Sequence, residues 1–158
     1  MRYTEYILKT VVILISLLYP FVLLSVEGEL NSISQYWDTS LQPVFILGNV
    51  MTAYFFFSMD DWKIPSFFLV LVTAFSVKLY PTIHNIVAVL FFISCLIPLF
   101  RSKRFKFYGY LYLLSPFIGL IGGLLYLEIY SIIVLCSYHL HSIIHVMSVL
   151  HQKHKLEG

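Results

Sequence analysis

Charged residues are scarce in this chain. Only 11% of its 158 residues are Asp, Glu, Lys or Arg, while 59% are hydrophobic; ordinary soluble domains carry about 25% charged residues. A soluble fold of this length leaves roughly a third of its chain surface in contact with water, which so few polar residues could not cover. The composition therefore excludes a soluble globular protein and places the apolar residues against lipid. The net charge of +2 is too small to indicate a nucleic-acid partner.

Cysteine is also scarce, and a cleavable leader is not evident. The two cysteines, Cys95 and Cys136, both lie inside apolar runs. Two buried free thiols are therefore favoured over a disulfide. The first apolar run, residues 11–26, is followed by Val26-Glu27-Gly28-Glu29 and not by an Ala-x-Ala-like cleavage site. We therefore interpret this run as a retained first helix.

Six apolar runs approach the length of about 20 residues that a membrane-spanning helix needs. They predict an all-α fold, a single polytopic membrane domain over residues 1–158 with six transmembrane helices. The expected helices cover residues 6–25, 42–58, 65–79, 82–100, 107–126 and 128–150. Only one break between them, residues 26–41, is long; the others are tight turns, so consecutive helices should be antiparallel neighbours.

The distribution of basic residues predicts the orientation of the bundle. With a cytoplasmic N-terminus, nine of the ten Lys and Arg residues fall on the cytoplasmic side and only Lys78 lies outside. The positive-inside rule favours this arrangement, with both termini in the cytoplasm and the acidic loop 26–41 outside. We expect a multi-pass protein of the plasma or inner membrane. The nine residues are Arg2, Lys9, Lys63, Arg101, Lys103, Arg104, Lys106, Lys153 and Lys155.

A group of polar residues meets at the outer interface in this topology. A histidine, carboxylates and hydroxyls there could carry out acid–base chemistry or bind a polar headgroup. An interfacial belt of aromatic residues with solvated charges explains the same pattern. The candidate catalytic residues are His84, Glu128, Ser34 and Asp38, and the candidate substrate-binding residues are Tyr36, Trp37, Lys78 and Tyr80.

The last expected helix carries a second polar group. Ser137, His141 and His145 are spaced by four residues and share one helical face. A polar stripe facing the bundle interior, a metal site or a proton relay would each account for this spacing. Two histidines need a third ligand to hold zinc, and His84 is the candidate. His84 opens its helix, however, whereas His141 lies ~20 Å along the last helix from the same side at 1.5 Å per residue.

One helix carries a ridge of small residues, Ser115-x3-Gly119-x3-Gly123. Such ridges allow two helices to approach closely within lipid. The partner could be another helix of the same chain, or a second subunit in a homo- or hetero-oligomer. Membrane lipids are the other expected partners.

Several short motifs resemble known families. Ser32-Ile-Ser34-x-Tyr36-x-x-Thr39, followed by Tyr80-Pro81-Thr82 with His84 and by Leu127-Glu128, is similar in order to uncharacterised bacterial multi-helix proteins with a Ser-Ile-Ser-x-Tyr-Tyr-x-Thr signature. The pattern also resembles the Frag/DRAM type of six-helix membrane protein. Both resemblances imply a six-helix membrane fold with an outer functional loop.

The His141-x3-His145 pair resembles the CREST superfamily of membrane hydrolases, which includes alkaline ceramidases and adiponectin-type receptors. That resemblance implies a zinc-dependent amide or ester hydrolase, with His84, His141 and His145 as ligands. Tyr80 stands where the superfamily pattern has a serine, and no Asp follows His84 in its expected helix.

Three hypotheses follow from these observations. The first is binding or processing of a lipid-like substrate at the outer polar site, with a metal-dependent hydrolase as its enzymatic form. The second is a non-catalytic subunit or scaffold of a membrane complex. The third is a small transporter or proton-coupled channel that uses the histidines of the last helix.

Overall fold

The structure is a computed structural model that describes residues 3–157, and 85% of it is helical. The prediction of an all-α fold is confirmed. Arg2, one of the basic residues assigned to the cytoplasmic side, lies outside the described residues, as does the side chain of Lys153. The elements in chain order are α1 (Tyr3–Glu27), η1 (Ile33–Asp38), α2 (Gln42–Phe57), η2 (Asp60–Trp62), α3 (Lys63–Ala74), α4 (Pro81–Arg101), α5 (Lys106–Tyr112), α6 (Ser115–Gly122) and α7 (Leu124–Glu157).

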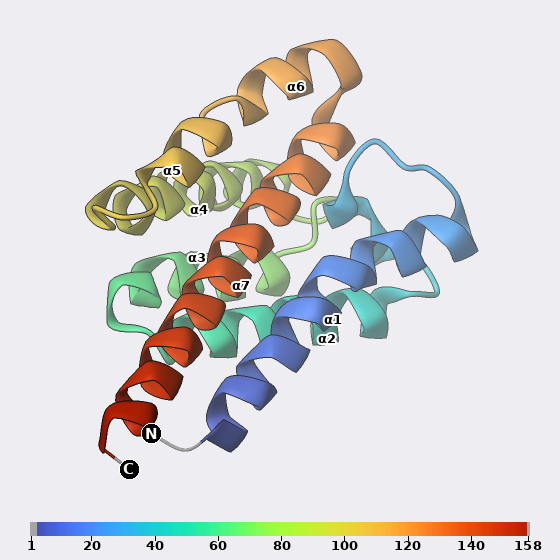
Figure 1. Cartoon of the computed structure of the whole chain (residues 1–158). Helices are drawn as coiled ribbons and strands as arrows, with labels where there is room; N and C mark the ends of the chain where they lie inside the picture. The colour runs from blue at the N-terminus through green and yellow to red at the C-terminus, as the bar shows by residue number, and fades with distance from the viewer. Residues whose placement is uncertain (1–2, 158) are drawn as a thin grey trace.

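The first four helices pack in chain order, and the long last helix packs against α1, α5 and α6. α1 packs on α2, α2 on α3 and α3 on α4, as expected for helices joined by short turns. α7 runs across the molecule beside α1 and closes the bundle (Figure 1). α6 packs on α7, and α5 packs on both α4 and α7. Both termini lie at one end of the bundle, and η1 lies at the other, near the start of α7 (Figure 1).

Three helices are long and apolar enough to cross a membrane: Thr4–Glu27, Pro81–Arg101 and Leu124–Gln152. These three segments are compatible with an integral membrane protein. α2 has 16 residues and α3 has 12, so they span about 24 Å and 18 Å at 1.5 Å per residue. Both are shorter than a hydrocarbon core of about 30 Å. The six-span topology with both ends inside therefore stays a prediction.

Three helix boundaries differ clearly from the sequence expectation. The third expected helix, residues 65–79, was placed too long: α3 ends at Ala74, and residues 75–80 form the turn to α4. The Ser76 hydroxyl accepts the backbone N–H groups of Lys78 and Leu79 and so stabilises this turn.

The fifth expected helix, residues 107–126, is divided into α5 and α6 at Leu113–Leu114, directly before Pro116. Proline favours the first turn of a helix and lacks the N–H that would continue α5. The expected break at residues 127–128 was wrong: α7 begins at Leu124, after Gly123. Gly123 has φ +93°, a conformation that glycine adopts without strain.

The outer surface of the helices is strongly apolar. Leu120 and Ile121 of α6 are 83% and 89% exposed, and exposed Ile and Leu side chains continue along α1 and α4. Soluble monomers rarely expose contiguous apolar surface on this scale. This surface supports the interpretation of the chain as a membrane protein.

The ridge of small residues packs within the chain. A Cβ on Gly119 would lie 2.8 Å from Leu127 Cδ1, so the missing side chain is what allows α6 to approach α7. Ser115 is buried, and its hydroxyl donates to the Tyr112 carbonyl at 2.6 Å. The ridge therefore forms the α6–α7 hairpin, and its use by a second subunit stays a prediction.

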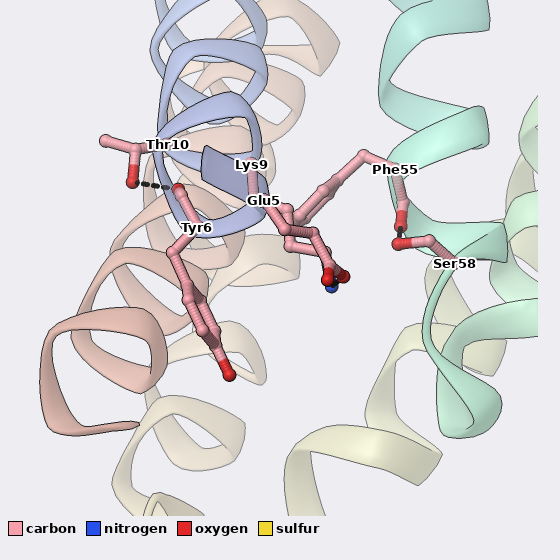
Figure 2. Close-up of polar contacts among 6 residues, drawn as sticks. All are labelled: Glu5, Tyr6, Lys9, Thr10, Phe55 and Ser58. Atoms are coloured by element: carbon pink, nitrogen blue, oxygen red, sulfur yellow. Dashed lines mark hydrogen bonds and ion pairs between the residues drawn. The ribbon is translucent and has the colours of Figure 1, made fainter. Parts of the chain in front are cut away.

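The end of the bundle that holds the termini also holds the ion pairs. Arg101 at the end of α4 pairs with Asp61 at 2.8 Å, which ties α4 to η2. Lys63 pairs with Asp60 at 2.7 Å, and this contact lowers the pKa of the Asp60 carboxyl. Lys9 Nζ lies 2.9 Å from Glu5 Oε1 in the first turns of α1. Figure 2 shows these two side chains. Lys9, Lys63 and Arg101 thus carry ion pairs at the end of the molecule that the prediction assigns to the cytoplasm, and the orientation itself stays a prediction.

Candidate functional site

The loop between α1 and α2 is held to the bundle by the η1 side chains. The Tyr36 hydroxyl donates to the Gly28 carbonyl, and Trp37 Nε1 donates to the Thr73 carbonyl at 2.8 Å. The Ser76 hydroxyl donates to the Asp38 carboxylate at 3.1 Å. Burial raises the pKa of the Tyr36 hydroxyl, which keeps it protonated as a donor. These three side chains position the loop, and they line neither of the two cavities described below.

Glu128 holds the other side of this loop. It lies in the second turn of α7, and its side chain is buried. Its carboxylate accepts the backbone N–H of Ile33, the first residue of η1. That N–H has no partner inside its own helix, as is general for the first turn. The Ser34 hydroxyl is a second donor toward the same carboxylate. Glu128 and Ser34, two predicted catalytic residues, are therefore adjacent.

His84 is the third predicted catalytic residue, and hydrogen bonding fixes its ring. The side chain is 3% exposed, and Nδ1 lies 2.7 Å from the Phe75 carbonyl oxygen. A carbonyl oxygen only accepts, so Nδ1 carries the hydrogen. In the neutral imidazole, Nε2 on the opposite edge of the ring then has a free lone pair.

A pocket of about 460 Å³ lies between η1, α4, α6 and α7; we call it the lateral pocket. Ser34, His84 and Glu128 all line it, so the structure brings these three predicted residues together. Asn85 and Ser32 line it beside them and were not predicted. The rest of the pocket is mainly apolar, with Val89, Phe92, Ile93 and Leu96 from α4 facing Leu113, Leu124 and Leu127.

The lateral pocket opens onto the apolar outer surface. Val89 and Ile93 of α4 line it and are 56% and 55% exposed. On the opposite wall, Leu113 and Leu124 are exposed as well. α6 packs on α7, and α4 packs on α5. The pocket lies in the gap between α4 and α6, which do not pack closely on each other. The opening of the lateral pocket therefore faces the apolar outer surface of the helices.

A second, smaller cavity of about 80 Å³ lies in the bundle interior and shares Ser34, Ala88, Phe92 and Glu128 with the lateral pocket. Its polar lining was not anticipated from the sequence. The hydroxyls of Ser16 and Thr52 lie 2.6 Å apart, joining α1 to α2. Tyr19 and Asn49 form a second link between the same helices, from the Tyr19 hydroxyl to Asn49 Oδ1 at 3.2 Å. The signal for these residues is their polarity inside spanning runs.

The remaining predicted binding residues lie outside the lateral pocket. Lys78 and Tyr80 are exposed in the turn between α3 and α4. The backbone N–H of Lys78 donates to the Ser76 hydroxyl at 3.1 Å, and the Tyr80 ring lies against Phe75. Asp38, predicted as catalytic, is bound to Ser76 and is absent from the pocket lining.

His141 and His145, the histidine pair singled out in the sequence, lie beside α5; His141 is exposed, whereas His145 is half-buried with its Nε2 shielded from solvent. His141 Nδ1 lies 3.3 Å from the Tyr108 hydroxyl. His145 lies edge-on to Phe105. The histidine that faces the interior is His139, which is 2% exposed and packs on Phe55, Phe56 and Trp62.

The three candidate zinc ligands do not form a metal site. Within residues 3–157, no three His, Cys, Asp or Glu side chains are grouped so that they could hold a metal ion. Because α7 begins at Leu124, His141 lies seventeen residues into it (141 − 124 = 17), about 26 Å along the axis. His84 lies near the start of α4, bound to Phe75. The donor set therefore does not fit a zinc centre.

No protein-family model, curated protein or solved structure matches this chain. The resemblances given above therefore depend only on the motifs quoted for them.

Proposed function

We propose that this protein binds a lipid-like amphiphile in the lateral pocket, with the polar group near Glu128 and the hydrocarbon chain between α4 and α6. The observation that carries the proposal is the lining of this pocket. Its volume of about 460 Å³ falls within the range of ~300–1,000 Å³ typical of small-molecule sites. The lining combines apolar walls with polar side chains that include Ser34, His84 and Glu128, as an amphiphile requires.

The lateral opening supports a ligand that arrives from the membrane. Val89 and Ile93 belong to both the pocket wall and the lipid-facing surface. A hydrocarbon chain could therefore pass from the bilayer into the pocket without crossing water. The polar side chains of the pocket can form hydrogen bonds that a hydrocarbon chain cannot provide. Leaving such groups without a partner in an apolar medium costs free energy, so a ligand with a polar group is favoured.

Binding, and not hydrolysis, is the function that the geometry favours. Glu128 and Ser34 lie at the polar end, but Glu128 is already bonded to the Ile33 N–H of the loop. Asp38, the fourth predicted catalytic residue, is held by Ser76 instead. The adjacent residues His84, Ser34 and Glu128 are therefore assigned to ligand binding.

The proposal can be tested by filling the pocket from α4. Ile93→Trp places a larger side chain in the wall, whereas Ile97→Trp, one turn further along the same helix, is the matched control. Ile97 is 58% exposed and does not line the pocket. Displacing two methylene groups of a bound chain costs about 1.6 kcal/mol at ~0.8 kcal/mol each, which is about 15-fold in affinity.

Lipid that remains on the protein after collisional release from nanodiscs can be counted by native mass spectrometry. We expect Ile93→Trp to lose most of the bound lipid that the wild type and Ile97→Trp retain. Equal retention by the two variants would contradict the proposal, because both add the same side chain to the lipid-facing surface of α4.

A further inference from the structure

The polar end of the lateral pocket lacks a cationic side chain. Among the described residues, no Lys or Arg lines this pocket. Lys78, which follows the lining residue Val77 in the chain, is exposed in the turn before α4 and is not part of the lining. Anionic phosphate and carboxylate groups are recognised in proteins mainly through Arg and Lys. An anionic headgroup therefore has no complementary charge here.

Two of the polar side chains, Glu128 when ionised and His84 when neutral, offer hydrogen-bond acceptors to the pocket. The Glu128 carboxylate accepts the Ile33 N–H through Oε2, and each carboxylate oxygen has room for a second donor. His84 has its hydrogen on Nδ1, against the Phe75 carbonyl, so its Nε2 accepts in the neutral ring. The other polar side chains of the lining, Ser32, Ser34, Asn85, Ser115 and Tyr112, can donate or accept.

We propose that the lateral pocket selects an amphiphile whose headgroup donates hydrogen bonds through hydroxyl or amine groups, and discriminates against anionic and donor-free headgroups. This inference rests on the proposed lipid binding and specifies its ligand class. The pocket volume lies in the lower half of the range for small-molecule sites, which favours one hydrocarbon chain over two. Glu128 and His84 receive the donors, and the α4–α6 walls hold the chain.

The test compares three probes with the same hydrocarbon chain. 1-Monooleoylglycerol has two hydroxyl donors, methyl oleate has acceptors only, and oleate is anionic. The full chain is placed in phosphatidylcholine nanodiscs, because the choline headgroup has no hydrogen-bond donor. The measurement is made at pH 8.5, where an ordinary histidine is neutral, and bound probe is counted by native mass spectrometry after release from the bilayer.

We expect the wild type to retain about tenfold more 1-monooleoylglycerol than methyl oleate or oleate, from one to two additional hydrogen bonds. In His84→Phe, this ratio should fall several-fold, whereas His141→Phe, the same substitution outside the pocket, should keep it. The ratio compares probes on one protein, so a general loss of folded protein does not change it.

The outcomes separate the two proposals. Equal retention of all three probes would overturn the headgroup assignment and leave lipid binding intact. Retention of none of them by the wild type would overturn the proposed function itself. An unchanged ratio in His84→Phe would show that His84 does not receive the donor.

Discussion

Replacing Glu128 with leucine removes the acceptor for the first N–H of η1. This carboxylate joins α7 to Ile33 in the loop, 95 residues earlier in the chain. Removing the acceptor leaves a buried N–H unsatisfied, which costs about 1–3 kcal/mol. A loss of about 2 kcal/mol from the local stability of the loop raises the equilibrium constant for its opening about 30-fold, since 1.4 kcal/mol corresponds to tenfold. Glu128→Gln keeps a carbonyl acceptor and should have a smaller effect, about fivefold.

Amide hydrogen exchange measures this opening directly. In nanodiscs, the peptide that contains η1 should exchange fastest in Glu128→Leu, less in Glu128→Gln and slowest in the wild type. Glu29→Leu is the control, because Glu29 lies in the same loop and is exposed. Unchanged exchange in Glu128→Leu would refute the role of Glu128 in holding the loop. An equal increase in Glu29→Leu would refute it too, since the effect would then follow from loss of any acidic residue.

Three further predictions concern packing and topology. Gly48→Ala should lower the thermal unfolding midpoint by about 2–6 °C, because the alanine Cβ would lie 2.7–2.9 Å from ring atoms of Tyr19. An unchanged midpoint would contradict the close approach of α1 and α2. Trp37→Phe removes one hydrogen bond to α3 and should cost about 1 kcal/mol, measured by denaturant unfolding; a neutral effect would mean that the bond is replaced. In two separate variants, Glu29→Cys and Lys103→Cys, a membrane-impermeant maleimide should label the new cysteine from opposite sides of the membrane. Labelling of both cysteines from the same side would contradict the predicted topology.

The helices and their turns could be predicted because their causes are local. A run of apolar residues identifies a helix in lipid, where each backbone group must find a partner within the helix. The boundaries of α1, α2 and α4 follow this rule closely. The last boundary was placed four residues late, at Glu128 and not at Leu124, because a charged residue suggested a turn. Gly123, with its positive φ, is the residue that ends the preceding helix.

The site was predicted only in part. Ser34, His84 and Glu128 were assigned to one outer cluster, and the structure places all three on the lateral pocket. Tyr36 and Trp37 came from the same loop, yet their polar atoms are bonded to backbone carbonyls and fix the loop in place. The sequence has no signal that separates a side chain pointing into a pocket from one that supports it.

The sequence by itself determined that the chain is helical and apolar, and it determined which polar residues lie near the ends of the apolar runs. Only the tertiary structure decided which faces of the helices meet. α7 carries apolar residues on all sides, so its periodicity did not indicate that His139 faces inward and His141 outward. The rotation of a helix in lipid is set by packing against its neighbours and not by contact with water. For the same reason, the Glu128–Ile33 bond and the lateral pocket between α4 and α6 were visible only once those neighbours were in place.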